Sequence, residues 1–423
     1  RLEMSSYGKG DIREPFVELV HADGSFTSDF LYDSYEIKKG RDELETLPCS
    51  YGSEDEVSQL KIILKDKSYG LTLELYYYVY EECDVIGRSC RLVNDSQDSV
   101  NIRRIMSMLM DIDGAGYVFT TFNGAWAREM DRHDTVVAAG KHVNSSYTGT
   151  SSSRANPFVM ISHKDTTQEH GSCIGLNLIY SGNHYEAVEV GMCDTTRIAA
   201  GINPQSFSYI LEPGSDFEAP EAVLTYSDSG FNAMSHNMHA FVRKHIVRGE
   251  WQYKERPVLL NSWEAAYFDI SERKLYDLAK AGRDVGIELF VMDDGWFGTR
   301  NDDSQSLGDW YVNKKKLPGG LKGICDRING LGMSFGIWVE PEMVNVNSGL
   351  YRKHPDWAMD IPGCAHSEGR SQRVLDLCNP EVAEYIVESM TRVFSSANIA
   401  YVKWDMNRMF SDYYSKYLHA QGR

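Results

Sequence analysis

The sequence predicts an antiparallel β-sandwich domain over residues 1–250, followed by the first half of a (β/α)8 barrel over residues 251–423. Two observations predict these folds. Before residue 250, short strand-like stretches alternate with polar turns, and after it apolar runs alternate with amphipathic helices. A chain of 423 residues, of which 42% are hydrophobic, is long enough to form two domains with their own cores.

The first half of the chain carries strand signals. Leu71–Tyr80 begins with alternating apolar and polar residues, and Ser99–Asp113 and Glu218–Ser227 are further strand candidates. Turn-forming stretches such as "NDSQDS", "DGAG" and "EPGSD" lie between such segments. Many short strands joined by polar turns are typical of a large antiparallel sandwich.

The second half carries four apolar runs, "RPVLLNSW", "IELFVMDDGW", "SFGIWVE" and "AYVKWDM". Helices are predicted between them: one from about Ser271, one over Gly320–Leu331 with Gly332 as its stop, and one capped by Asn379 and Pro380. Apolar runs that alternate with helices predict βαβ units and a parallel sheet.

The length of the second half predicts only part of a barrel. A complete barrel needs roughly 250 residues, whereas 173 follow residue 250. We therefore expect about four strand–helix units, and we expect the chain to be a fragment of a longer protein. The segment 341–379 is longer than an ordinary connection, so we expect it to cover the site.

Composition disfavours several classes of protein. A formal net charge of −18 disfavours a nucleic-acid partner, and no apolar run has the length of a membrane span. The eight cysteines form no Cys-x-x-Cys motif, which predicts reduced thiols and a cytoplasmic protein. No glycine-rich phosphate loop follows the first parallel strand, so we expect no nucleotide cofactor.

Polar side chains follow the predicted parallel strands. They comprise carboxylates, tryptophans and a lysine: Trp263, Asp293, Asp294, Trp338, Glu340, Lys403 and Asp405. In a (β/α)8 barrel the carboxyl ends of the strands form the active-site face. Carboxylates beside aromatic rings and a cation suit glycoside cleavage, in which one carboxylate attacks the anomeric carbon and another group protonates the leaving oxygen.

Other interpretations of these residues remain open. A hard-metal site could use Asp293, Asp294, Asp302 and Asp303, although "TRNDDSQS" is more typical of a solvated loop. A single aspartate at a strand end is more often a helix cap than a nucleophile. The inference therefore depends on several such residues at successive strand ends. No Gly-x-Ser-x-Gly motif supports acyl transfer.

Several long stretches resemble the α-galactosidases of glycoside hydrolase family 36. They are "NSWEAAYFD", "ELFVMDDGWFG", "SLGDWYVNKKKLPGGL", "FGIWVEPEMV", "RKHPDW", "SEGR" and "YVKWDMNR". Upstream, "GDIREPFVEL", "NPFVMIS" and "GFNAMS" are similar to the N-terminal β-supersandwich of that family. The resemblance covers nearly the whole chain and implies a retaining double displacement.

The resemblance implies roles for individual residues. Asp405 is implied as the nucleophile, and Asp293 and Asp294 as acceptors for the 4- and 6-hydroxyls of galactose. The other implied sugar contacts are Lys403 and Asn407 to ring hydroxyls, Trp338 along the pocket, Arg370 to the sugar and Trp263 at the pocket entrance. Three nearby residues are left as either structural or functional: Trp296, Glu340 and Glu342.

The resemblance also implies what the chain lacks. The family's acid/base aspartate lies on a later barrel strand, whereas only Asp412 follows Asp405 here, and the family's first strands before "GDIREP" are absent. We expect this piece to be inactive by itself. The implied substrates are galactosides such as melibiose and raffinose, no metal or cofactor is implied, and a homo-tetramer is expected. The alternatives are a transglycosidase of the same clan, a noncatalytic carbohydrate-binding scaffold and a metal-dependent hydrolase.

Overall fold

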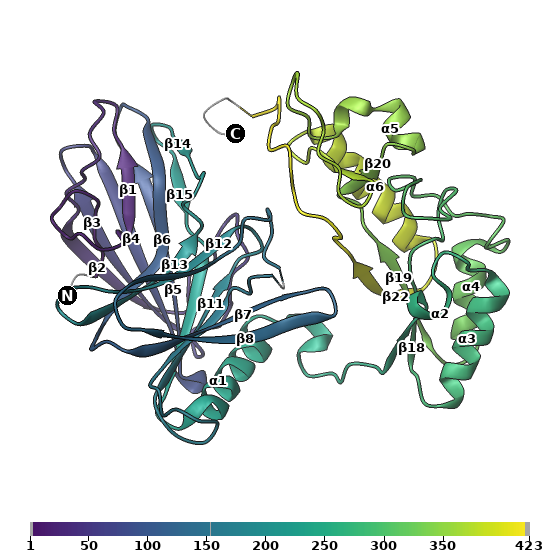
Figure 1. Ribbon diagram of the computed structural model, residues 1–423, viewed down its shortest axis with the longest axis horizontal. Coiled ribbons are helices and arrows are strands. Elements are labelled where there is room, and N and C mark those ends of the chain that lie inside the picture. Colours follow the sequence, from purple (N-terminus) through teal and green to yellow (C-terminus); the bar gives the residue numbers. More distant parts are fainter. Residues whose placement is uncertain (1–2, 153, 419–423) are drawn as a thin grey trace. The chain divides into compact units, whose positions relative to one another are not determined.

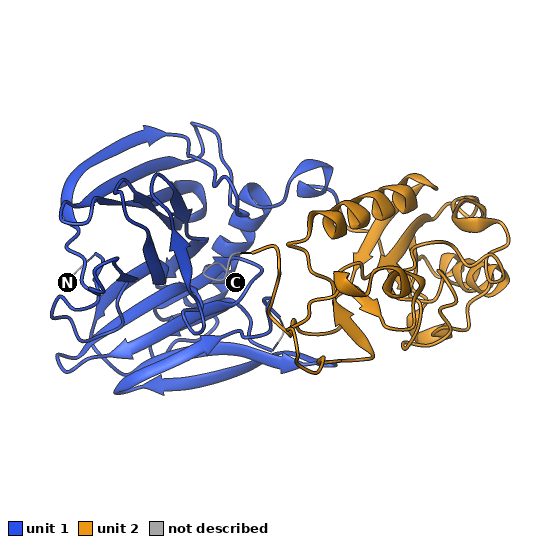
Figure 2. Ribbon diagram, turned by 90° about the horizontal axis from the view of Figure 1, so that it is seen from above, with its two compact units in different colours: residues 1–254, 422 blue, residues 255–421, 423 orange. Residues whose placement is uncertain are grey.

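The computed structural model describes residues 3–152 and 154–418 (Figure 1). The chain divides into two compact units, one of residues 1–254 and one that begins at Glu255 (Figure 2). Within the described residues, no helix combines the length and the apolar character that crossing a membrane requires.

The first unit contains two antiparallel sheets. The larger has the order β2-β3-β4-β5-β16-β11-β10-β7-β8, with β15 beside β5, and the smaller has the order β1-β6-β13-β12-β9, with β14 beside β6. The strands of the larger sheet are β2 (Leu31–Lys39), β3 (Ser58–Asp66), β4 (Leu71–Tyr80), β5 (Val85–Asn94), β7 (Tyr117–Ala125), β8 (Arg128–Val137), β10 (Phe158–Ser162), β11 (Cys173–Ile179), β15 (Asp216–Glu218) and β16 (Glu221–Ser227). Those of the smaller sheet are β1 (Val17–Val20), β6 (Val100–Asp113), β9 (Gly140–Ser145), β12 (His184–Val190), β13 (Thr195–Ile202) and β14 (Tyr209–Leu211).

Strand β4 shows how the first unit is packed. Leu71, Leu73 and Leu75 lie on one face in a core shared with β6 and β13. Tyr78 and Tyr80 lie on the opposite face and pack against the helix α1 (Gly230–His245). Because both faces of this strand are buried, it carries apolar residues at successive positions and not only at every second one. The sandwich predicted from the sequence is thus present.

Helix α1 was not predicted from the sequence, in which residues up to about 250 carry mainly strand signals. The buried residues Met234, Met238, Phe241 and His245 of α1 recur at intervals of three and four, which is the period of a helix. This periodicity was the signal that could have revealed the helix.

The second unit contains one parallel sheet. Its strands are β17 (Leu259–Asn261), β18 (Leu289–Met292), β19 (Ser334–Val339) and β22 (Ile399–Trp404), and their order in the sheet is their order in the chain. The helices α3 (Glu272–Asp284), α4 (Gly320–Asn329) and α6 (Pro380–Ser395) lie between them in sequence. A sheet wound in one direction is the arrangement of the first half of a (β/α)8 barrel, whereas a doubly wound sheet reverses its order.

The helix boundaries follow from local chemistry. The Ser271 hydroxyl accepts a hydrogen bond from the Lys274 N–H at the start of α3, and the Asn379 side chain caps α6 in the same way. Both starts agree with the sequence prediction. Helix α4 ends at Asn329 with Gly330 as its C-cap, so the predicted end at Leu331 was two residues too late. Gly332, with φ of 81°, lies in the turn that leads into β19.

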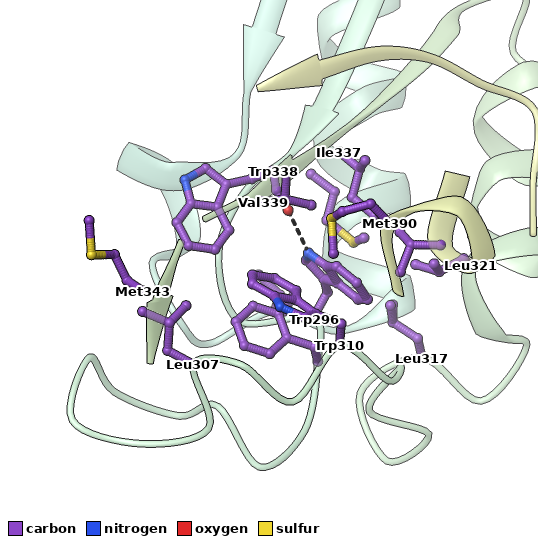
Figure 3. Close-up of a cluster of buried hydrophobic side chains, with 14 of the residues drawn as sticks. Trp296, Leu307, Trp310, Leu317, Leu321, Ile337, Trp338, Val339, Met343 and Met390 are labelled. Carbon is purple, nitrogen blue, oxygen red and sulfur yellow. Dashed lines mark hydrogen bonds between the residues drawn. The ribbon is translucent and has the colours of Figure 1, made fainter. Parts of the chain in front are cut away.

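The long segment before α6 is ordered rather than a plain loop. It contains β20 (Met343–Asn345), which pairs with β21 (Gln372–Val374), and the short helix α5 (Gly349–Lys353). Apolar side chains of this segment belong to a buried cluster that also includes Trp296, Trp310 and Trp338 (Figure 3). The indole N–H of Trp296 donates to the carbonyl oxygen of Trp338 at 2.9 Å. Trp296 is completely buried, so it is a core residue that ties the segment after β18 to β19.

Candidate active site

The carboxyl ends of the four parallel strands bring polar residues from distant parts of the chain to one edge of the sheet. Asn261 ends β17, Asp293 and Asp294 follow β18, Glu340 follows β19, and Asp405 follows β22. The backbone N–H of Asp405 donates to the Val339 carbonyl at 2.8 Å, which continues the pairing of β19 with β22 up to the carboxylate. The arrangement has the geometry of a barrel active-site face.

Asp293 receives hydrogen bonds from side chains of two other strands, β17 and β22. The Lys403 ammonium donates to its Oδ2 at 2.9 Å, and the Asn261 amide donates to the same oxygen at 2.6 Å. The Asp293 N–H in turn donates to the Ser262 hydroxyl at 3.0 Å. These contacts fix a buried carboxylate at the end of β18.

Lys403 pairs with a carboxylate that is distant in sequence. It lies only two residues before Asp405 in the chain. The structure pairs its ammonium with Asp293 instead. A long, flexible side chain bridges to the carboxylate that offers the closest ion pair, and sequence proximity does not decide which one that is.

Asp294 forms a buried ion pair with Arg300. The Arg300 Nε donates to Oδ1 at 3.0 Å and Nη2 donates to Oδ2 at 2.7 Å. The two side chains are 2% and 8% exposed. Burial raises the pKa of Asp294, while the guanidinium acts in the opposite direction. Arg300 also donates to the side-chain oxygen of Asn345 at 2.9 Å, which anchors β20 to the site.

Arg300 and Asn345 were missed from the sequence. Arg300 lies in "TRNDDSQS", which resembles a solvated loop. The part of the loop around Asp302 is indeed self-contained, because this carboxylate accepts hydrogen bonds from Ser304 and Gln305. The sequence held no signal that the neighbouring arginine turns inward.

Asp405 is surrounded by neutral donors. Its Oδ2 accepts hydrogen bonds from the Trp338 indole N–H at 2.9 Å and from the Asn407 amide at 2.6 Å. Its Oδ1 accepts from the Met406 N–H at 3.0 Å. The carboxylate remains partly exposed, whereas Trp338 is 2% exposed. The buried indole therefore aims its only donor at Asp405.

Asn407 connects Asp405 to Arg370. The Arg370 Nη1 donates to the Asn407 Oδ1 at 2.6 Å. Since a guanidinium can only donate, the Asn407 oxygen faces Arg370 and its NH₂ group faces Asp405. Arg370 itself is exposed at a turn, where it has a φ of 53°.

Glu340 and Glu342 have different surroundings. Glu340 is fully buried and accepts hydrogen bonds from the Asn407 backbone N–H and from the Gln372 amide. Burial raises the pKa of Glu340 to about 7, and the charge of Asp405 acts in the same direction. Glu342 accepts the indole N–H of Trp404 at 2.9 and 3.0 Å. Burial raises its pKa as well.

Trp263 lies at the start of the short helix α2 (Trp263–Ala266), directly after β17. Its ring meets Tyr267 and Phe268 edge to face, with ring centroids 5.1 Å apart in both cases. Its backbone N–H donates to the Asn261 side chain at 2.7 Å. Trp263 thus shares the strand-end edge of the sheet, and its ring belongs to an aromatic group at the end of β17.

Comparison with known families agrees with this fold. Residues 1–212 match the glycosyl hydrolase family 36 N-terminal domain, and residues 216–422 match the melibiase domain. The chain belongs to glycoside hydrolase family 36. The resemblance inferred from the motifs is thereby confirmed.

Individual relatives are α-galactosidases. The chain is 43% identical over 411 residues to the alpha-galactosidase AgaA of Geobacillus stearothermophilus, an alignment that covers 97% of this chain and 56% of AgaA. It is 41% identical over 413 residues to the bifunctional alpha-galactosidase/sucrose kinase AgaSK of Mediterraneibacter gnavus, covering 98% of this chain and 44% of AgaSK.

A solved structure confirms the fold class. The crystal structure of AgaA superposes with a TM-score of 0.97 at 42% identity, covering 99% of this chain and 58% of that one. Variants of AgaA have been solved in complex with stachyose and with raffinose. The chain thus spans a little over half of the length of AgaA, and a β domain followed by a half-barrel is the part they share.

Proposed function

We propose that the natural full-length protein is a retaining α-galactosidase that removes terminal α-linked galactose from oligosaccharides such as melibiose and raffinose. One observation carries the proposal: the partly exposed carboxylate of Asp405 is oriented by neutral donors at a barrel strand end, beside two carboxylates that are paired with cations. The α-galactosidase activity of AgaA and its raffinose complex support the same substrate class.

Asp405 is proposed as the nucleophile. Its carboxylate attacks the anomeric carbon, the glycosidic bond breaks, and a covalent galactosyl-enzyme forms, which water then hydrolyses. The Trp338 and Asn407 donors hold the carboxylate in place for that attack. Protonation of the leaving oxygen requires a second carboxyl group, which the family resemblance puts on a later strand than Asp405.

The remaining residues are proposed as the galactose pocket. Asp293 and Asp294 are acceptors for the 4- and 6-hydroxyls, since a carboxylate has about four acceptor positions and the protein donors do not occupy all of them. The other proposed contacts to the sugar are Trp263, Trp338, Arg370, Lys403 and Asn407. The side chains of Trp338, Lys403 and Asn407 already donate to carboxylates of the site, so a sugar would bind among existing hydrogen bonds.

The proposal is tested by hydrolysis of p-nitrophenyl α-galactoside with the full-length protein. Asp405→Asn should lower kcat by roughly 10⁴-fold or more, because the attacking group is lost. Asp326→Asn on the exposed face of α4 is the matched control and should leave kcat unchanged.

Three outcomes would contradict parts of this proposal. Activity that survives Asp405→Asn would make Asp405 a structural residue. A wild-type protein that binds galactosides but does not hydrolyse them would favour the carbohydrate-binding scaffold. Loss of activity on treatment with a chelator would favour the metal-dependent hydrolase.

Location and assembly are proposed from the cysteines and from the family resemblance. A cytoplasmic location is supported by the eight cysteines, all of which are free thiols. A homo-tetramer is proposed from the family resemblance. Light scattering on the purified full-length protein would measure its mass directly.

A further inference from the structure

Glu340 is a buried acid whose carboxylate links two segments of the candidate site. It follows β19 and is 0% exposed. Its Oε1 accepts the backbone N–H of Asn407, and its Oε2 accepts the Gln372 amide at 3.0 Å. A buried carboxylate is costly unless it is hydrogen-bonded, so both contacts contribute to its retention at this position.

The Gln372 contact anchors a strained turn. Residues 369–372 form a tight turn in which the Gln372 N–H donates to the Gly369 carbonyl at 3.0 Å. Its two central residues, Arg370 and Ser371, have φ values of 53° and 58°. Residues other than glycine adopt this conformation at a cost, so contacts around the turn must maintain it. Gln372, which is 1% exposed, provides such a contact at the base of the turn.

This turn also orients Asn407. Arg370 donates to the Asn407 Oδ1 at 2.6 Å, and the Asn407 NH₂ group donates to Asp405 Oδ2 at 2.6 Å. Glu340 therefore reaches Asn407 in two ways: directly through the backbone N–H, and indirectly through Gln372 and the turn that carries Arg370. Hydrogen bonds and the turn thus connect Glu340, Gln372, Arg370 and Asn407 in a ring. The Asn407 amide connects this ring to the carboxylate of Asp405.

We propose that Glu340 is a positioning residue for Asp405: it holds the backbone and the side chain of Asn407 so that the Asn407 amide fixes the attacking carboxylate. This inference rests on the proposed role of Asp405 as the nucleophile. Glu340 itself touches Asn407 and Gln372, and its effect on the reaction passes through them.

One acceptor in the ring has no hydrogen-bond donor, and this allows the proposal to be tested with the conservative substitution Glu340→Gln. The Gln372 Oε1 is buried and has no hydrogen-bond partner among the described residues. Rotation of the Gln372 amide would turn this oxygen toward position 340. In Glu340→Gln, the introduced oxygen can accept from the Asn407 N–H while the introduced NH₂ donates to the rotated Gln372 oxygen. Glu340→Ala loses both contacts.

The experiment measures kcat and KM of the full-length protein on p-nitrophenyl α-galactoside and on α-galactosyl fluoride. Fluoride leaves without help from a proton donor, so this substrate reports on attack by the nucleophile. Displacement of a reacting group by about 1 Å can lower the rate by about 100-fold, so we expect Glu340→Ala to lower kcat by about 10- to 100-fold on both substrates. The rise in KM should be smaller than the fall in kcat, and Glu340→Gln should recover kcat to within about fivefold of the wild type.

Two further variants separate positioning from general damage to the fold. If Glu340 acts through Asn407, then adding Glu340→Ala to Asn407→Ala should lower kcat by less than about threefold more, because coupled residues are not additive. Should Glu340→Ala fail to fold, Gln372→Ala can be used in its place. It removes the hydrogen bond from Gln372 to Glu340 but keeps the one from the Asn407 N–H, and it is expected to lower kcat by about tenfold.

The outcomes distinguish this inference from the proposed function. If the wild type is active and Asp405→Asn is not, but Glu340→Ala has normal kcat or its effect adds fully to that of Asn407→Ala, the positioning role is wrong and the proposed function stands. A Glu340→Gln variant as impaired as Glu340→Ala would also overturn the positioning role. A wild type that reacts with neither substrate overturns the proposed function itself.

Discussion

The carboxylates after β18 differ from those after β19 and β22, although all four lie at one edge of the same sheet. Asp293 and Asp294 are each paired with a cation, Lys403 and Arg300 respectively. The hydrogen bonds to Asp405 and Glu340 come, within the described part of the chain, from neutral groups: the Trp338 indole, the amides of Asn407 and Gln372, and backbone N–H groups.

This difference matches the different roles proposed for the carboxylates, binding for one pair and attack on carbon for Asp405. A carboxylate paired with a cation is held in position by charge-assisted hydrogen bonds, which suits an acceptor for sugar hydroxyls. A carboxylate held by neutral donors keeps more of its own electron density for attack on carbon. In the proposed assignment, the binding carboxylates and the reacting one therefore differ in the charge of their partners.

Chemical rescue provides the largest expected contrast between the two regions. Asp405→Ala should lower kcat by roughly 10⁴-fold or more, and sodium azide should restore part of it, because azide can enter the space and attack the anomeric carbon. Asp293→Ala should also be impaired, but azide should not restore it, since the missing group is a hydrogen-bond acceptor. Release of p-nitrophenol with and without azide measures both. Rescue of Asp293→Ala alone would reverse the two assignments.

Removal of the cation from the buried pair should destabilise the protein strongly. Arg300→Met leaves the Asp294 carboxylate buried without its partner, which costs about 3–5 kcal/mol. Urea unfolding of the full-length protein measures this change. The matched control is Arg327→Met, which breaks an ion pair with Glu272 that is 42% and 21% exposed and should cost about 0–1 kcal/mol. If both variants lose the same free energy, burial does not distinguish the pairs.

The burial of Glu340 predicts a dependence of stability on pH. Burial, with the charges of Asp405 and Asp294 acting in the same direction, raises the pKa of Glu340 from 4.5 to about 7. The folded protein therefore holds this proton more tightly than the unfolded chain, so the contribution is complete below pH 4.5 and is lost as the pH rises through 7. At about 1.4 kcal/mol for each pKa unit, the loss amounts to about 3 kcal/mol.

Glu340→Gln tests that expectation, because an amide stays neutral throughout this range. The free energy of unfolding of the variant minus that of the wild type should increase by up to about 3 kcal/mol as the pH rises from roughly 5 to 8. The exposed Glu388 on α6 provides the control Glu388→Gln, for which no such gain is expected. A constant difference between Glu340→Gln and wild type across this range would show that Glu340 does not titrate there.

The smallest expected effect concerns a single neutral donor. Trp338→Phe removes the indole N–H that donates to Asp405, and a hydrogen bond to a charged group contributes about 1.5–3 kcal/mol, so kcat should fall by about 10- to 100-fold. Trp310→Phe is the matched control, since Trp310 is similarly buried but its indole N–H has no hydrogen-bond partner among the described residues. Equal losses of kcat would mean that packing, and not the hydrogen bond, explains the effect.

Local signals in the sequence predicted the elements that local chemistry controls. Ser271 and Asn379 cap the helices that they were expected to cap. The apolar runs became strands, and the polar residues after them lie at the predicted edge of the sheet. The period of α1 was equally local, but it was overlooked within a region dominated by strand signals.

The sequence by itself determined the order of strands and helices and the residue types at the strand ends, because both depend on the periodicity of neighbouring residues. Only the tertiary structure decided which groups meet. Lys403 bonds to Asp293 across 110 positions of the chain, although Asp405 is two residues away. Arg300 turns out of a polar stretch into a buried ion pair. Such contacts depend on side-chain reach and on burial, which are properties of the folded sheet edge and not of any segment alone.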